Sequence, residues 1–275
     1  MKIAKWLKDN TELLQSAGIE SARLDCLILL EDALGLNRAQ ILARPEFTLS
    51  TALLKQLNSR IAARKTHLPL AYIRGKTEFY GREFLVNDTV LVPRPESEQI
   101  ITTLKRFAKK YIINTAVDIG TGSGALAITA KLTLPNLEVM GVDISEECLT
   151  IAQQNAEALG AAVTLARSDL LESVQLNSLG QTALLVNLPY VPTHHPINQA
   201  AAHEPTLALF GGNDGLDLYR TLFDSFKKQR PLAVLCESLE TQHEALQSIA
   251  HEHDYVLAET NELVQLFTDS AQLQA

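Results

Sequence analysis

The stretch whose residues are best suited to chemistry is 184–190, which reads LLVNLPY. Its apolar start is typical of a short buried β-strand that ends abruptly at Asn187. In an open α/β sheet, ligands and catalytic groups collect beyond the carboxyl ends of the strands. The side-chain oxygen of Asn187 and the carbonyl of Leu188 could both accept from one NH2 group, because Pro189 restricts Leu188 to extended conformations. The stretch therefore predicts a site that holds an NH2 group.

A glycine-rich turn follows an earlier predicted strand at residues 116–119 and opens a helix. Glycines at alternate positions let the backbone turn tightly and approach a ligand closely. An aspartate enters the turn, and this suits a positively charged ligand better than one that carries phosphates. The predicted cofactor contacts here are Asp118, Gly120, Thr121, Gly122, Ser123 and Gly124.

Acidic residues also follow the next two predicted strands. Asp143 lies nineteen residues beyond Gly124, where a carboxylate can accept hydrogen bonds from both ribose hydroxyls. At the end of the third strand, Asp169 could accept from an adenine amino group and Leu170 could pack on the ring. A nucleoside cofactor with a positive charge fits this set, and S-adenosylmethionine has the amino group, sulfonium, ribose and adenine required. Asn187 completes the predicted cofactor contacts.

The nitrogen of an amide or aromatic amine is a poor nucleophile because its lone pair is delocalised. Acceptors for both of its N–H bonds would hold it in line with the cofactor methyl group and favour the charge that develops during transfer. Tyr190 could lie against the planar target group. The predicted catalytic residues are Asn187, Pro189 and Tyr190, and Leu188 joins them in the predicted substrate site.

The elements that must position these residues alternate along the second part of the chain. Repeated β–α units from residue 93 to 275 predict a doubly wound, mostly parallel sheet. Strands are expected at residues 116–119, 137–142, 163–165, 184–186, 232–236, 255–257 and 263–267. Residues 75–92 resemble a β-hairpin linker, with 71–73 sharing its aromatic and β-branched character.

Residues 1–74 are predicted to form a small all-α helical bundle, because apolar residues recur there at helical spacing without strand patterns. Leu13 and Leu24 are expected on the buried stripes of the first two helices. Ser21 and Ser50 are the expected N-caps of the second helix and of a later one.

Composition excludes several classes of function. The chain has 275 residues, a net charge of −8 and a pI near 5.4, which disfavour a broad phosphate-binding surface and direct, sequence-specific nucleic-acid binding. Its three cysteines lack CxxC spacing, and His194, His195 and His203 show no regular metal-ligand pattern, so no metal site is expected. Without a signal-peptide core or membrane span, a cytoplasmic, monomeric protein is the expectation.

Several segments together resemble the release factor glutamine methyltransferases, from about residue 20 to residue 222. Besides the two motifs above, they are SARLD at 21–25, PLAYI at 69–73, FYG at 79–81, VPRPE at 92–96, GVDIS at 141–145, HEP at 203–205 and GGNDGLD at 211–217. The resemblance implies a seven-stranded class I methyltransferase domain. It also implies transfer to the side-chain amide nitrogen, N5, of the Gly-Gly-Gln glutamine in class-1 peptide chain release factors. The N-terminal domain would help to engage the release factor, and the loop after Tyr190 would shape the glutamine site.

Two departures from the family pattern leave alternatives open. The family usually has Asn-Pro-Pro-Tyr, whereas Leu188 occupies the second position here, as it does in small-subunit rRNA adenine dimethyltransferases. The turn at residues 237–239 lacks a glycine, and the family's charged C-terminal strand pattern is absent at 262–268. The alternatives are an adenine-N6 methyltransferase acting on nucleic acid and a non-catalytic module that binds S-adenosylmethionine.

Overall fold

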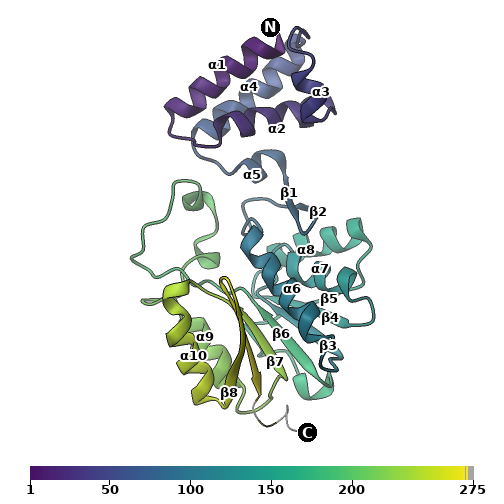
Figure 1. Cartoon of the computed structure of the whole chain (residues 1–275), viewed down its shortest axis with the longest axis vertical. Coiled ribbons are helices and arrows are strands. Elements are labelled where there is room, and N and C mark those ends of the chain that lie inside the picture. Colours follow the sequence, from purple (N-terminus) through teal and green to yellow (C-terminus); the bar gives the residue numbers. More distant parts are fainter. Residues whose placement is uncertain (270, 272–275) are drawn as a thin grey trace. The chain divides into compact units, whose positions relative to one another are not determined.

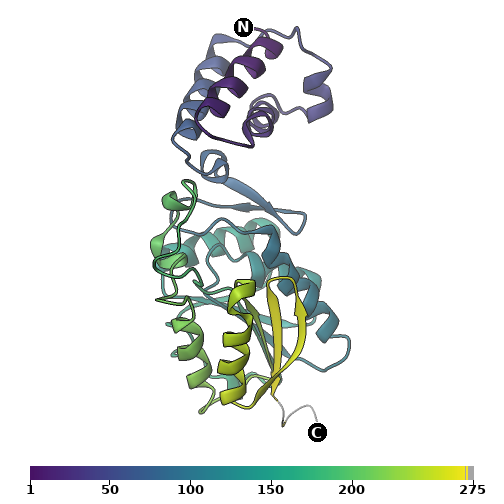
Figure 2. The ribbon, with the colours of Figure 1, turned by 60° about the vertical axis from the view of Figure 1, so that its left-hand side comes forward.

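The computed structural model describes residues 1–269 and 271, and the chain divides into two compact units. The first unit contains residues 1–75 together with 197–203. The second contains residues 76–196 and the chain from Glu204 onward. Figures 1 and 2 show the N-terminal helices from purple to blue and the strands of the large sheet in the second unit from teal to yellow.

The first unit is the predicted helical bundle. Its helices are α1 (Ile3–Ser16), α2 (Ala22–Leu34), α3 (Arg38–Leu42), α4 (Thr51–Lys65) and α5 (Leu70–Arg74). Trp6 is fully buried at its centre, where the indole N–H donates to the Asn58 side chain on α4 at 3.1 Å. The Ser50 cap is confirmed, because its hydroxyl accepts from the Leu53 N–H at 3.3 Å.

One local prediction for this unit is wrong. Leu13 and Leu24 are 39% and 44% exposed, because α1 and α2 turn neighbouring residues such as Leu14 and Leu29 into the core. Ser21 occupies the predicted N-cap position of α2, but its side chain makes no cap hydrogen bond. Residues 71–73 are aromatic and β-branched and nevertheless lie in helix α5, which ends at a left-handed Gly75.

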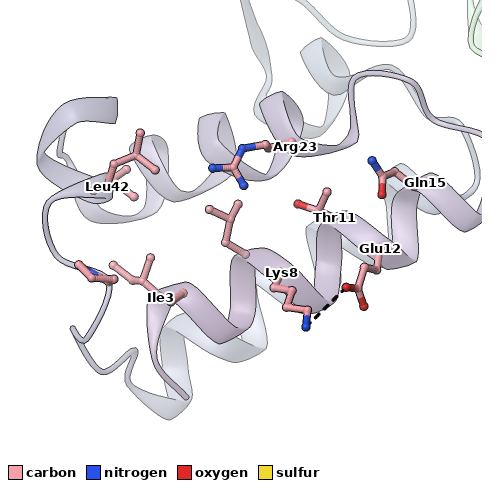
Figure 3. A pocket seen from close by; sticks show the side chains of 11 residues that line it. Ile3, Lys8, Thr11, Glu12, Gln15, Arg23 and Leu42 are labelled. Atoms are coloured by element: carbon pink, nitrogen blue, oxygen red, sulfur yellow. Dashed lines mark ion pairs between the residues drawn. The ribbon is translucent and has the colours of Figure 1, made fainter.

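A hollow of about 400 Å³ opens between α1, α2 and the segment around α3 (Figure 3). Ile3 and Leu42 contribute apolar surface, and Arg23 extends over it from α2. Lys8 and Glu12 form an ion pair of 3.9 Å along α1. All of these lining residues belong to the first unit.

The second unit begins with the predicted hairpin, β1 (Lys76–Phe79) and β2 (Arg82–Leu85), and continues into a seven-stranded sheet. The sheet strands are β3 (Thr115–Ile119), β4 (Glu138–Asp143), β5 (Thr164–Arg167), β6 (Thr182–Val186), β7 (Ala233–Glu237), β8 (Tyr255–Asn261) and β9 (Val264–Asp269). Their order is β5-β4-β3-β6-β7-β9-β8, and only β9 runs antiparallel to its neighbours. The predicted fold class is confirmed, including the C-terminal edge that departs from the family pattern.

Helices cover both faces of this sheet (Figure 1). On β6, Ala183 and Leu185 join the core beneath α6 (Glu98–Phe107), α7 (Ala125–Thr133) and α8 (Glu146–Leu159). Leu184 and Val186 join the opposite core beneath α9 (Asp217–Ser225) and α10 (His243–Glu252). A strand that is buried on both faces reads as the continuous apolar run seen at residues 182–186. Short 3₁₀ helices complete the chain: Pro95–Ser97, Leu176–Ser178, Ala201–His203, Thr206–Ala208 and Glu240–Gln242.

The strand order reverses between β3 and β6. From β3 the chain moves outward to β4 and β5, and then returns to place β6 on the other side of β3. The two strands are parallel and in register, with Ile119 opposite Val186. The loops that leave their carboxyl ends therefore start side by side, at the point where such sheets bind ligands.

None of the helices in residues 1–269 and 271 is both long and apolar enough to cross a membrane.

Candidate functional site

The glycine turn after β3 needs glycine for conformational reasons. Gly120, Gly122 and Gly124 have φ values of +72°, +54° and +80°, a region that other residues rarely adopt. A Cβ on Gly124 would lie 2.8 Å from Ile128 and 3.1 Å from the Ala152 side chain. The turn is therefore compact against α7 and α8, and its backbone lies at the strand-order reversal.

Asp118 holds this turn together from inside. It is 1% exposed, and its carboxylate accepts from the Thr121 hydroxyl at 2.7 Å and from the Ala127 N–H at 3.1 Å. Burial raises the pKa of Asp118 from its ordinary value of 3.8 to about 7, although both hydrogen bonds oppose the shift. The structure thus gives Asp118 a role in shaping the turn, and its predicted contact with the cofactor stays a prediction.

Asp143 lies at the end of β4 beside the same turn. One carboxylate oxygen accepts from the Gly122 N–H at 2.9 Å, and the other accepts from the Ser145 N–H at 2.9 Å. A carboxylate oxygen has two lone pairs, so each retains capacity for a further donor such as a ribose hydroxyl. The backbone bonds fix the carboxylate plane, and this arrangement supports the predicted role of Asp143.

Asp169 and Leu170 follow β5 in the predicted place. Asp169 is exposed, and its carboxylate accepts no hydrogen bond from the residues that the structure describes. Leu170 is half-buried at a left-handed φ of +45° and packs against the core beneath α9 and α10. Their adenine contacts remain predictions, and Asp169 is free to make one.

The amide of Asn187 is held by a residue that the sequence did not single out. Its Nδ2 donates to the hydroxyl of Ser97, which is 3% exposed, at 2.8 Å. Within the described chain, no donor reaches the Asn187 side-chain oxygen. The carbonyl of Leu188 lies 3.5 Å from the Tyr219 hydroxyl, whose hydrogen bond to the Glu237 carbonyl is much shorter. Both acceptors predicted for an NH2 group thus remain available.

The side chain of Leu188 also has a structural place. It is 5% exposed, and its Cδ2 lies 3.4 Å from the position that a Cβ on Gly120 would take. Leu188 therefore packs directly on the glycine turn and belongs to the core beneath α9 and α10. The side chain of Leu188 therefore links the Asn187 motif to the glycine turn, and its carbonyl takes no part in that contact.

The segment after Asn187 is held by the glycine-rich loop at residues 211–215. A Cβ on Gly211 would lie 2.1 Å from the Pro189 carbonyl oxygen, and one on Gly215 would lie 2.0 Å from that of Tyr190. The Gln242 side chain donates to the Tyr190 carbonyl at 2.7 Å. Only glycine permits this close approach, so the loop acts as a template for the backbone of the Asn187 motif.

Tyr190 is tied to a second buried carboxyl group. Its hydroxyl donates to Glu237 Oε1 at 2.9 Å, and Glu237 is fully buried at the end of β7. Burial raises the pKa of Glu237, whereas the Tyr190 hydroxyl and the nearby polar groups of Ser97 and Asn187 oppose that rise. Burial also raises the pKa of the Tyr190 hydroxyl, with Glu237 adding to the shift. Tyr190 is therefore a neutral donor whose ring orientation is fixed.

An ion pair joins two of the motifs that carry the family resemblance. One Arg94 nitrogen lies 2.7 Å from each oxygen of Glu204, although the residues are separated by 110 positions. Burial raises the pKa of Glu204 and the Arg94 guanidinium opposes that rise. This pair brings the Pro-Arg-Pro-Glu and His-Glu-Pro segments together in space.

Sequence reasoning missed several residues that position the site. Ser97, Glu237 and Gln242 are described above. Asn155 on α8 donates to the Ser123 carbonyl at 2.9 Å and exchanges hydrogen bonds with the Leu85 backbone. These residues could have been noticed as polar residues at positions where an apolar one is expected, namely at the end of a buried strand or on the inner face of a helix.

Over residues 1–269 and 271, no cluster of three or more His, Cys, Asp or Glu could hold a metal ion. Cys26, Cys148 and Cys236 are free and buried.

Comparison with known proteins agrees with this geometry. Residues 5–75 match the PrmC N-terminal domain family, and residues 97–204 match the methyltransferase small domain family. A release factor glutamine methyltransferase of Moorella thermoacetica is 38% identical over 226 residues, covering 81% of this chain and 79% of the relative. One from Bacillus subtilis is 35% identical over 225 residues, covering 79% and 77%.

The chain belongs to the release factor glutamine methyltransferase family. The enzyme class is therefore an S-adenosylmethionine-dependent methyltransferase, and the predicted cofactor is confirmed. Among solved structures, the catalytic domain of hMettl16 in complex with a MAT2A 3′UTR hairpin covers 77% of this chain and 80% of its own. With 12% identity and a TM-score of 0.50, that likeness concerns the fold alone.

Proposed function

We propose that this chain transfers the methyl group of S-adenosylmethionine to the side-chain amide nitrogen, N5, of the Gly-Gly-Gln glutamine in class-1 peptide chain release factors. One observation carries the proposal. The Asn187 amide donates backward to Ser97, so its oxygen and the Leu188 carbonyl are left as two acceptors beside the glycine turn. A primary amide presents the matching pair of N–H donors, and membership of the family favours glutamine as their source.

The residues around the turn suit the cofactor. The left-handed glycines bring bare backbone to the reversal point, and Asp143 is held with spare lone pairs for ribose hydroxyls. Within the described chain, Asp118, Asp143 and Glu237 accept hydrogen bonds from neutral groups and none from a lysine or arginine, which suits a cationic ligand. When bound, S-adenosylmethionine supplies a methyl group on a positively charged sulfur.

The chain's own contribution is orientation and charge stabilisation. Asn187 and Leu188 accept the two amide N–H bonds, which aligns the nitrogen lone pair and stabilises positive charge as it develops there. Tyr190, held by Glu237, packs against the planar amide. The extra proton leaves the nitrogen after methylation, so no side chain has to remove it beforehand.

We assign engagement of the release factor to the helical first unit. It holds eleven Lys and Arg against seven Asp and Glu within residues 1–75, whereas the rest of the chain holds thirteen against twenty-five. A net basic unit is suited to contacting a protein substrate through charge complementarity.

The test is methyl transfer with labelled cofactor. The purified chain is incubated with an intact release factor, with the same factor carrying Asn in place of the Gly-Gly-Gln glutamine, and with rRNA. The proposal expects label only in the intact factor. Mass spectrometry of the labelled peptide should place one methyl group on the glutamine side chain.

Label in rRNA would instead favour an adenine-N6 methyltransferase. Cofactor binding without label in any substrate would favour a non-catalytic module. Equal labelling of the glutamine-replaced factor would contradict the assigned acceptor.

A further inference from the structure

We infer that Glu237 and Ser97 form a positioning pair that sets which way round the Asn187 amide is held. This inference rests on the proposed function and adds two residues to it. Glu237 ends β7 and Ser97 precedes α6, so the pair reaches the Asn187 motif from two different elements. Neither residue is placed against the substrate.

The two ends of a carboxamide differ in hydrogen bonding and hardly in shape. The oxygen and the nitrogen of an Asn side chain are similar in size, so packing alone does not decide which faces the substrate. If Asn187 presented its NH2 group, two donors would oppose each other and the glutamine amide would not be held. A catalytic amide in this position therefore needs a partner behind it that accepts hydrogen bonds.

Ser97 is that partner, but a hydroxyl alone does not select an orientation. A serine hydroxyl both donates and accepts, so it could receive the Asn187 NH2 or donate to the Asn187 oxygen. The observed contact has Asn187 Nδ2 donating to Ser97 Oγ at 2.8 Å. Ser97 is 3% exposed, so its own hydrogen must be given to a neighbour inside the protein.

Glu237 supplies an acceptor for that hydrogen. Its Oε1 receives the Tyr190 hydroxyl at 2.9 Å, and its Oε2 is buried without a hydrogen bond of good geometry among the described residues. Val186 on β6 lies opposite Cys236 on β7, so the residues that follow them, Asn187 and Glu237, leave neighbouring strand ends. The Asn187 amide and its partner Ser97 are therefore the donors beside this carboxyl. A carboxylate only accepts, so it draws the Ser97 hydrogen toward itself and leaves Ser97 Oγ to accept from Asn187.

The successive hydrogen bonds then all run in one direction, from donor to acceptor. Glu237 accepts from Ser97, Ser97 accepts from Asn187, and the Asn187 oxygen is turned toward the glutamine. The same carboxyl also fixes the Tyr190 ring through its hydroxyl. One buried acid thus orients both side chains that are proposed to hold the target amide.

Four variants of the full chain test the pair. Ser97→Ala removes the relay, and Ser97→Thr keeps the hydroxyl. Glu237→Gln keeps the shape but adds a donor, so the direction of the relay is lost. Ser238→Ala is the matched control, because its hydroxyl is equally buried on the same turn but has no partner in the described chain.

Initial rates with an intact release factor give kcat and KM, and calorimetry gives the cofactor Kd. We expect Ser97→Ala and Glu237→Gln to lower kcat about 10- to 100-fold with the cofactor Kd unchanged within about twofold. Ser97→Thr should regain most of kcat, and Ser238→Ala should stay within about twofold of the parent. The pair is overturned if Ser97→Ala or Glu237→Gln keeps the parent kcat, or if Ser97→Thr falls as far as Ser97→Ala.

A second measurement needs no substrate and separates this inference from the proposed function. In a ¹⁵N-labelled sample, the Asn187 side-chain NH2 signal is identified by its loss in Asn187→Ala. Its hydrogens should exchange slowly in the parent and in Ser97→Thr, and quickly in Ser97→Ala and Glu237→Gln. Fast exchange of the Asn187 hydrogens in the parent would overturn the pair. If that exchange is slow but the methyl-transfer assay puts no label into the release factor, only the proposed function is overturned.

Discussion

Buried carboxyl groups in the cofactor region of the catalytic unit are treated differently from the buried Asp25 of the helical unit. In the helical unit, Asp25 is 4% exposed and lies 2.7 Å from the Arg64 guanidinium, which makes a fixed bond between α2 and α4. At the strand ends of the catalytic unit, Asp118, Asp143 and Glu237 receive backbone N–H groups or hydroxyls instead of cations. Paired acids hold structure together, and acids without a cation leave negative potential for a positively charged cofactor.

Replacing the acceptor residue should have the largest effect on function. We expect Asn187→Ala to lower kcat by about 1,000-fold or more, because one of two acceptors for the amide is lost and charge stabilisation goes with it. The cofactor Kd should change by less than about threefold in calorimetry. Asn136→Ala, on an exposed turn between α7 and β4, is the control. Substantial activity in Asn187→Ala would contradict the orienting role.

Breaking the buried ion pair should affect stability and not chemistry. Arg64→Met leaves the Asp25 carboxylate buried without its partner, so we expect a loss of about 3 to 5 kcal/mol from the helical unit. Trp6 is the single tryptophan and lies in this unit's core, so its fluorescence in urea reports the loss directly.

The matched control is Arg38→Met, since Arg38 and Glu31 are 3.4 Å apart with side chains that are 47% and 25% exposed. That change should cost less than about 1 kcal/mol. Cofactor affinity should be unchanged in both variants. A large rise in cofactor Kd for Arg64→Met would show that the two units are not energetically separate.

The buried acid of the glycine turn should make stability depend on pH. The pKa of Asp118 is raised by burial from 3.8 to about 7, so the folded state binds the proton more tightly than the unfolded state. The free energy of unfolding should therefore fall as pH rises from about 4 to about 7, by up to about 3 kcal/mol. Asp118→Asn should remove this part of the fall in urea titrations of the cofactor-free protein. Parallel curves for both proteins would contradict it.

Replacing Asp143, the carboxylate predicted to bind the ribose, should have a smaller effect that is confined to cofactor binding. We expect Asp143→Ala to raise the Kd for S-adenosylmethionine about 10- to 100-fold, because two hydroxyl acceptors are lost together. Asp169→Ala should raise it by less than about fivefold, since Asp169 is exposed. Glu138→Ala, at an exposed residue that starts β4 at the end opposite Asp143, serves as the reference. Equal effects of Asp143→Ala and Asp169→Ala would remove the distinction between them.

Local patterns predicted the elements of the catalytic unit well. Each expected strand is present, because apolar runs between polar turns have few other stable arrangements in a sheet covered on both faces. The helical unit was harder. Leu24 is exposed although it continues the apolar spacing of Leu27, since α2 is apolar on several sides and its partners decide which side is buried.

The sequence by itself determined the motifs and the order in which they occur. The glycine turn, Asp143 and the Asn187 strand end are local features, because backbone freedom and strand burial act over a few neighbouring residues. Which polar groups meet was decided only by the tertiary structure. Glu237, Ser97 and Asn187 come from three separate elements, and only the parallel packing of β6 beside β7 and the position of α6 bring them together. The direction in which the Asn187 amide points follows from that meeting, because hydrogen-bond polarity is a property of neighbours in space and not of spacing along the chain.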